Sequence, residues 1–137
     1  MSLTAAVAAV TLVATSPHPP PERLKAVARK EIEEFEGAAD ASLAPEVFTK
    51  GYQLHFAGNP SMDVKGHQGV LAMFRTAFPD LSIQVLGQVT QGDRVANHFV
   101  MKGTHRGDFQ GIPATGKAFT VTGTNLMRFE GEKIAEL

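Results

Sequence analysis

The sequence contains no cysteine and no tryptophan, and its charges almost cancel, with 13 Lys and Arg against 14 Asp and Glu. The absence of cysteine excludes a disulfide framework, a thiolate nucleophile and zinc sites built on cysteine. The net charge of −1 argues against a basic surface that tracks phosphate groups, so we expect no nucleic-acid partner. At 137 residues, the chain fits one compact domain.

Long apolar runs are also missing. The longest, from Leu3 to Ala14, is too short to cross a bilayer, so we expect no transmembrane segment. It would suit the apolar part of a secretory signal, but residues 1–4 carry no Lys or Arg. A proline-rich stretch follows, which is typical of a stiff linker. We therefore expect residues 1–20 to precede a domain over residues 21–137. The protein is expected in the cytoplasm, or in a secreted or periplasmic location if residues 1–16 are a signal.

The usual motifs for metals, nucleotides and nucleophiles do not occur. There is no HExxH, no GxSxG, no GxGxxG and no phosphate-binding loop, and no two histidines have i, i+4 spacing. We therefore expect neither a metal nor a cofactor. The histidines available for other chemistry are His18, His55, His67, His98 and His105.

The chain is predicted to begin with helices and to end with antiparallel strands, which is an α+β organisation. Apolar residues recur at helical spacing between Pro21 and Glu36 and again between Gly66 and Phe78. Alternating patterns and turn residues indicate strands in the second half, with a hairpin turn at residues 91–93. The other predicted elements are a short helix over 40–48 and strands over 52–56, 81–89, 95–104, 118–129 and 133–137.

The densest motif runs from Gly103 to Gly116 and reads G-T-H-R-G-D-F-Q-G-I-P-A-T-G, with Arg128-Phe129 and Lys133-Ile134-Ala135-Glu136 after it. On these residues the chain resembles the SnoaL-like polyketide cyclase (ester cyclase) family, over roughly residues 24–137. The resemblance implies an NTF2-like cone, in which a curved, mixed and mostly antiparallel sheet wraps around N-terminal helices. It also implies an apolar pocket for a small-molecule ligand and a homodimer formed through the sheet.

Family members with a known reaction close a ring in a polyketide ester by intramolecular aldol condensation. The resemblance thus implies proton abstraction next to a carbonyl, which needs a carboxylate in a dry pocket and donors near the enolate. In the family the acid/base Asp lies about two residues past the K-I-x-E-x pattern, which falls beyond Leu137, and the family's C-terminal tail is absent as well. Glu136 has the opposite strand parity, so it is not an obvious replacement.

Several residues are candidates for the site. Catalytic candidates are His55, at the end of the early strand, Asn125, where the cyclases place a pocket histidine, and His105 of the signature motif, which could instead hold its loop. His67 is interpreted as an ordinary surface residue, and Arg128 is expected to pair with a carboxylate across the sheet. Candidates for substrate binding are His98, Phe74, Phe99, Gly123 and Met127, whose alternative roles are packing or solvent contact.

Three functional hypotheses follow. The first is a cyclase-type protein that binds a small apolar carbonyl compound or polyketide and closes a ring by acid/base chemistry. The alternative is a non-catalytic module of the same fold, for ligand binding or dimerisation, that has lost the carboxylate. A third, hydration or hydrolysis on this fold, would need an Asp-Arg-Asp cluster that the sequence does not assemble.

Overall fold

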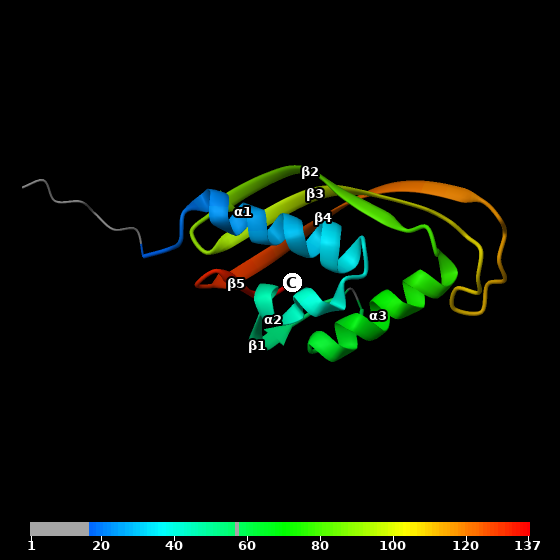
Figure 1. The fold of residues 1–137 in the computed structure, drawn as a ribbon, viewed down its shortest axis with the longest axis horizontal. Helices are drawn as coiled ribbons and strands as arrows, with labels where there is room; N and C mark the ends of the chain where they lie inside the picture. Colours follow the sequence, from blue (N-terminus) through cyan, green and yellow to red (C-terminus); the bar gives the residue numbers. More distant parts are fainter. Residues whose placement is uncertain (1–16, 57) are drawn as a thin grey trace, which may run out of the picture.

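The computed structural model describes residues 17–56 and 58–137, so most of the expected N-terminal extension lies outside the described residues. Helices come first and long strands follow, as the α+β prediction requires (Figure 1). The helical elements are α1 (Pro21–Lys30), the π-helix η1 (Glu31–Glu36), the 3-10 turn η2 (Ala41–Leu43), α2 (Ala44–Val47) and α3 (Val64–Ala77). The strands are β1 (Phe48–Gln53), β2 (Ser82–Gln91), β3 (Arg94–Thr104), β4 (Ala118–Glu130) and β5 (Lys133–Glu136).

The strands form one curved sheet in the order β1-β5-β4-β3-β2. All neighbours are antiparallel except β1 and β5, which run parallel, so the sheet is mixed as expected. The predicted hairpin joins β2 to β3, and Gly92 there has a φ of +58°, a conformation that glycine adopts without steric cost. The helices lie on the concave side of the sheet (Figure 1).

Several element boundaries differ from the sequence prediction, and two of them have a clear cause. The first strand begins at Phe48 rather than Tyr52, because Phe48 pairs with Ile134 of β5, a partner far away in the chain. Helix α3 begins at Val64 rather than Gly66, because the Asp63 side chain caps its first turn by accepting a hydrogen bond from the backbone N–H of Gly66 at 2.9 Å. Tertiary pairing and capping set these ends.

A further difference concerns the first helix, which was predicted as one continuous element to Glu36. The structure contains a change of winding at Glu31, where the α-helix passes into the π-helix η1. Its inner face still packs in the core, since Leu24, Ala28, Ile32 and Phe35 are buried against the sheet. A π-helical turn inside a longer helix is rare and often found at functional sites.

Candidate active site

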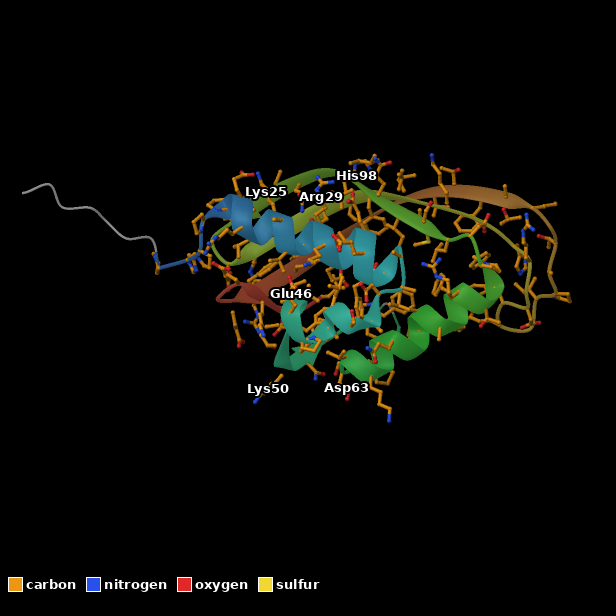
Figure 2. All side chains as sticks on the ribbon, viewed as in Figure 1. Lys25, Arg29, Glu46, Lys50, Asp63 and His98 are labelled. Atoms are coloured by element: carbon orange, nitrogen blue, oxygen red, sulfur yellow. The ribbon has the colours of Figure 1, made fainter. Side chains whose placement is uncertain are left out.

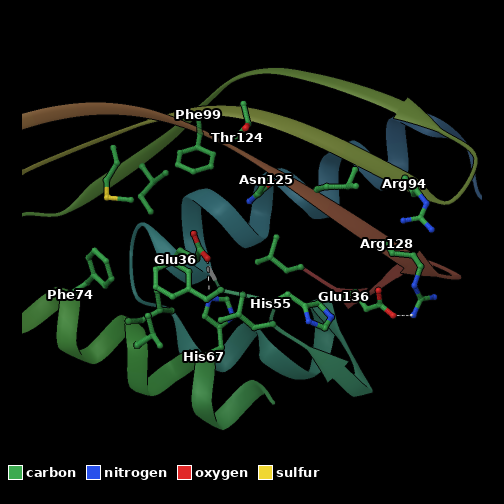
Figure 3. Close-up of a pocket in the computed structure, with 18 residues that line it drawn as sticks. Glu36, His55, His67, Phe74, Arg94, Phe99, Thr124, Asn125, Arg128 and Glu136 are labelled. Atoms are coloured by element: carbon green, nitrogen blue, oxygen red, sulfur yellow. Dashed lines mark hydrogen bonds and ion pairs between the residues drawn. The ribbon is translucent and has the colours of Figure 1, made fainter. Parts of the chain in front are cut away.

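A cavity of about 600 Å³ lies between α3 and the concave face of the sheet (Figure 3). Its walls are largely apolar, and its size is that of pockets for small organic ligands. Polar groups gather at two places, a buried floor beside η1 and a mouth beside the end of β5. The apolar wall residues include Val70, Leu71, Phe74, Ile83, Phe99 and Met101.

The floor is formed by Glu36 from η1 and His67 from α3. Nε2 of His67 lies 3.0 Å from Oε1 of Glu36, and both residues line the cavity. The His67 side chain is only 2% exposed, so its interpretation as a surface residue was wrong. It lies near the start of α3, where Phe35 of η1 and the rings of Phe48 and Tyr52 of β1 pack around it.

Tyr52 and Glu31 lie behind this pair. The Tyr52 hydroxyl is 3.0 Å from Nδ1 of His67, so both ring nitrogens of the histidine have a partner. Burial, followed by the charges of Glu31 and Glu36, raises the pKa of Tyr52. Glu31 is fully buried, and burial, then the neighbouring charge of Glu36, raises the pKa of Glu31 well above its ordinary value. This set of four residues is called the floor cluster below.

The π-helix explains why two glutamates meet at the floor. A π-helix bonds residue i to residue i+5, so residues five apart lie one above the other. Glu31 and Glu36 have that spacing, and with His67 they place ligand atoms within 4.8 Å of one another. Glutamate and histidine also bind cations, but Glu36 and His67 already hydrogen-bond each other here. In a regular α-helix, Glu31 and Glu36 would not share a face.

A chain of three amides reaches the cavity opposite the floor. Gln88 Nε2 donates to the backbone oxygen of Lys25 at 2.9 Å and to Asn97 Oδ1 at 2.8 Å. Asn97 Nδ2 in turn donates to Asn125 Oδ1 at 2.8 Å. A backbone oxygen can only accept, so this end fixes the orientation of every amide in the chain. Asn125 therefore presents its Nδ2 donor to the cavity that it lines (Figure 3).

The mouth carries charged groups that remain near water. Arg128 donates to Glu136 at 2.8 Å and to Glu130 at 3.1 Å, which confirms its predicted pairing with a carboxylate across the sheet. The hydrogen bond from Arg128 lowers the pKa of Glu136, and the charges of Arg128 and His55 act in the same direction. Arg94 lies directly across the strand pair from Arg128 and also lines the mouth.

The residues proposed from sequence divide into two groups. His55, Asn125, Phe74 and Phe99 line the cavity. The remaining candidates, His98, His105, Gly123 and Met127, are not among its lining residues. His98 is exposed on the outer face of the sheet (Figure 2).

The second group has structural surroundings. Nδ1 of His105 is 3.1 Å from the Thr115 hydroxyl within the signature loop, which it helps to close. Gly123 lies under the Phe99 ring, where an added Cβ would come within 2.7 Å of the ring. Met127 is buried in the core. Gly123 thus shapes the cavity indirectly, by leaving room for an aromatic wall.

Sequence reasoning missed the floor cluster. The helical pattern gave neither Glu31 nor Glu36 a role, and Tyr52 was predicted only as the first residue of a strand. A weak signal exists, since Glu31 directly precedes the buried Ile32 and neither glutamate has a basic residue four positions later. Only the change to π-helical winding turns both glutamates inward.

Comparison with known proteins gives the family. Residues 26–137 match the SnoaL-like polyketide cyclase family. The chain belongs to this family. Its fold is the NTF2-like α+β fold that the sequence motif predicted. A search of curated proteins found no significant match.

Solved structures agree with this assignment. A protein of Jannaschia sp. CCS1, described as a SnoaL-like polyketide cyclase, is 22% identical with a TM-score of 0.77, covering 86% of this chain and 85% of its own. IdmH of Streptomyces antibioticus, described as a polyketide cyclase, is 28% identical with a TM-score of 0.70, over 84% and 88%. AclR of Streptomyces galilaeus, described as a hydroxylase, is 23% identical with a TM-score of 0.73, over 84% and 72%. Similarity at 22–23% identity supports the fold alone.

One further finding concerns membranes. Within the part of the chain that the structure describes, no helix is both long and apolar enough to span a bilayer.

Proposed function

We propose that this SnoaL-like protein binds a small, largely apolar polyketide-type carbonyl compound and closes a ring in it by intramolecular aldol condensation, with Glu36 as the base. The observation that carries the proposal is the position of the Glu36 carboxylate, held by His67 at the floor of an apolar cavity. A carboxylate at this position can reach a proton of a ligand bound in the cavity, which is the first requirement for a general base. The expected last-strand Asp is not required for this mechanism.

The proposed reaction balances without a cofactor. Glu36 takes a proton from the carbon next to a ligand carbonyl, and the enolate oxygen that forms accepts a hydrogen bond from Asn125 Nδ2. The enolate carbon then attacks a second carbonyl of the same molecule, forming the new carbon–carbon bond. The resulting alkoxide takes back the proton from Glu36, which restores the carboxylate. The apolar walls keep water from quenching the enolate.

The test compares Glu36→Gln with the wild type on aromatic polyketide esters. We expect the wild type to melt at a higher temperature with ligand and to turn it over, and Glu36→Gln to bind it with a turnover reduced at least about 100-fold, the usual contribution of general-base catalysis. Glu46→Gln, an exposed glutamate that bonds Lys30 outside the cavity, is the matched control. The absence of both turnover and a thermal shift in the wild type would contradict the proposal.

The alternative function is ligand binding without catalysis. It is favoured by one observation, that the last-strand carboxylate, Glu136, is paired with Arg128 at the mouth and not presented at the floor. On this reading the same ligands raise the melting temperature, but no product forms and Glu36→Gln changes binding only slightly. Product analysis of the same incubations separates the two functions.

We also propose a homodimer formed through the outer face of the sheet. Val89 pairs with Ala96, and Ala96 with Leu126, so these residues make one row across three strands. Val89 and Leu126 are 68% and 53% exposed, a large apolar area to leave in water. Light scattering should give twice the monomer mass, and Val89→Glu should halve it, whereas Ser82→Glu at the other end of β2 should not. A monomeric wild type would contradict the dimer.

A further inference from the structure

Glu31 is a buried acid that the proposed reaction leaves without a role. Its side chain has no exposed surface, and neither oxygen of an ionised Glu31 has a hydrogen-bond donor within reach. Two facing carboxylates cannot hydrogen-bond, since neither has a donor, and an isolated buried charge is strongly unfavourable. Glu31 therefore needs either a proton or a bound cation.

The surrounding hydrogen bonds indicate where the protons are. Tyr52 keeps its proton, because burial and two neighbouring acids raise its pKa, and its hydroxyl can donate to Nδ1 of a neutral His67 ring. A neutral His67 ring then carries its own proton on Nε2 and donates it to Glu36 Oε1, 3.0 Å away. Both hydrogen bonds, from Tyr52 to His67 and from His67 to Glu36, then point toward Glu36, whose carboxylate is the final acceptor.

We propose that Glu31 is a permanently protonated positioning residue that donates a hydrogen bond to Glu36, leaving Glu36 as the single anion of the floor cluster. A proton on Glu31 satisfies a carboxyl group that is otherwise unpaired, and it completes the set of donors around Glu36. Glu36 is 16% exposed and lines the cavity, so its remaining acceptor capacity faces the ligand. Glu31 keeps its proton while Glu36 gains and loses one.

The charged groups around Glu36 are few. From its own element it faces Glu31, from α3 it faces His67, and from β1 Tyr52 acts through His67. Arg75 of α3 donates to the backbone oxygens of Glu36 and Gly37, which brings one fixed positive charge near the end of η1. Arg75 does not change its charge with pH, so titration here belongs to the floor cluster.

The role of Glu36 as the base rests on the proposed function. The proton on Glu31 can be tested without any substrate. Carbon-13 labelling of the glutamate carboxyls allows each pKa to be followed by NMR, with Glu31 and Glu36 assigned from the signals lost in Glu31→Gln and Glu36→Gln. In the wild type at pH 7, we expect Glu31 at the chemical shift of a protonated acid and Glu36 at that of a carboxylate. An ionised Glu31 at pH 7 would overturn the proposal.

Two variants of Glu31 test its hydrogen bond to Glu36, by whether the pKa of Glu36 stays the same, rises or falls. The Glu31→Gln amide still donates, so the pKa of Glu36 should stay within a few tenths of a unit. Glu31→Met removes the donor without changing charge, so the pKa of Glu36 should rise by about one unit. If Glu31 were ionised, both variants would remove a negative neighbour, and the pKa of Glu36 would fall.

A cation is the remaining possibility, and Zn²⁺ is its probe. We expect Zn²⁺ to leave the wild-type melting temperature unchanged. A rise on adding one equivalent of Zn²⁺, lost in Glu31→Gln but kept in Glu46→Gln, would show a metal site and overturn the proposal. Because these measurements need no turnover, they can fail or succeed independently of the proposed function.

Discussion

The two ends of the cavity hold the same residue types in opposite electrostatic states. At the floor, burial raises the pKa of Glu31 well above its ordinary value. At the mouth, the hydrogen bond from Arg128 lowers the pKa of Glu136. The difference lies in what surrounds each carboxyl group, a buried network in one case and a half-buried arginine in the other. We infer that proton chemistry belongs to the floor, whereas the mouth provides charges that stay fixed.

The same comparison predicts how each end tolerates substitution. Tyr52→Ala at the floor removes a buried ring packed 4.1 Å from the Phe48 ring, together with the partner of His67. We expect the free energy of unfolding to fall by about 3–5 kcal/mol, measured by urea denaturation. At the mouth, Arg94→Ala should change it by less than about 0.5 kcal/mol. Equal losses of unfolding free energy in Tyr52→Ala and Arg94→Ala would contradict the difference between the floor and the mouth.

The amide chain should behave as part of the buried end. Asn97 is 1% exposed, and Asn97→Ala removes one acceptor of Gln88 Nε2 and the donor to Asn125 Oδ1. We expect a loss of about 1–3 kcal/mol in unfolding free energy and weaker ligand binding, because Asn125 is no longer held. Asn125→Ala should lower the unfolding free energy less than Asn97→Ala does, and should weaken ligand binding by a similar amount. A stable Asn97→Ala protein with unchanged binding would show that Asn125 needs no support.

Stability should depend on pH through Glu31. Its folded pKa is raised, so between the unfolded and folded values the unfolded chain binds fewer protons, and wild-type stability falls as pH rises. Glu31→Gln lacks this term and should match the wild type near pH 4 and exceed it at pH 7, with a slope difference of up to about 1.4 kcal/mol per pH unit. Chemical denaturation at a series of pH values measures this, and a constant difference would refute it.

The smallest effect is expected at the mouth, with the opposite sign. The pKa of Glu136 is lowered in the folded state, so its contribution to stability is present above the ordinary value and is lost as pH falls through the folded value. Glu136→Gln should therefore be slightly less stable than the wild type at pH 7 and equal to it in acid. The same denaturation series checks it, and a penalty that persists in acid would show that Glu136 acts through packing.

Much of the fold could be predicted from the sequence because it follows from local pattern. Alternation placed β2, β3 and β4 within a residue or two of their observed ends, and the Gly103–Gly116 motif gave the family. The start of β1 could not be predicted, since only its parallel pairing with β5 makes Phe48 part of a strand. Long-range pairing has no local signature.

The site was only partly predictable for the same reason. Asn125, His55, Phe74 and Phe99 were named as candidates from the sequence, and all four line the cavity. Glu31 and Glu36 escaped, because helical periodicity assumes one winding, and the π-helix brings together residues five apart. The buried acids depend on a local departure from regular geometry.

The most direct test of the central claim is proton abstraction itself. Wild-type protein and Glu36→Gln are incubated in D2O with a simple ketone ester that exchanges slowly in buffer, and deuterium entering the carbon next to the carbonyl is followed by NMR. We expect the wild type to accelerate the exchange, Glu36→Gln to lose this effect and Glu46→Gln to retain it. Equal exchange rates for the wild type and Glu36→Gln would contradict the assignment of Glu36 as the base.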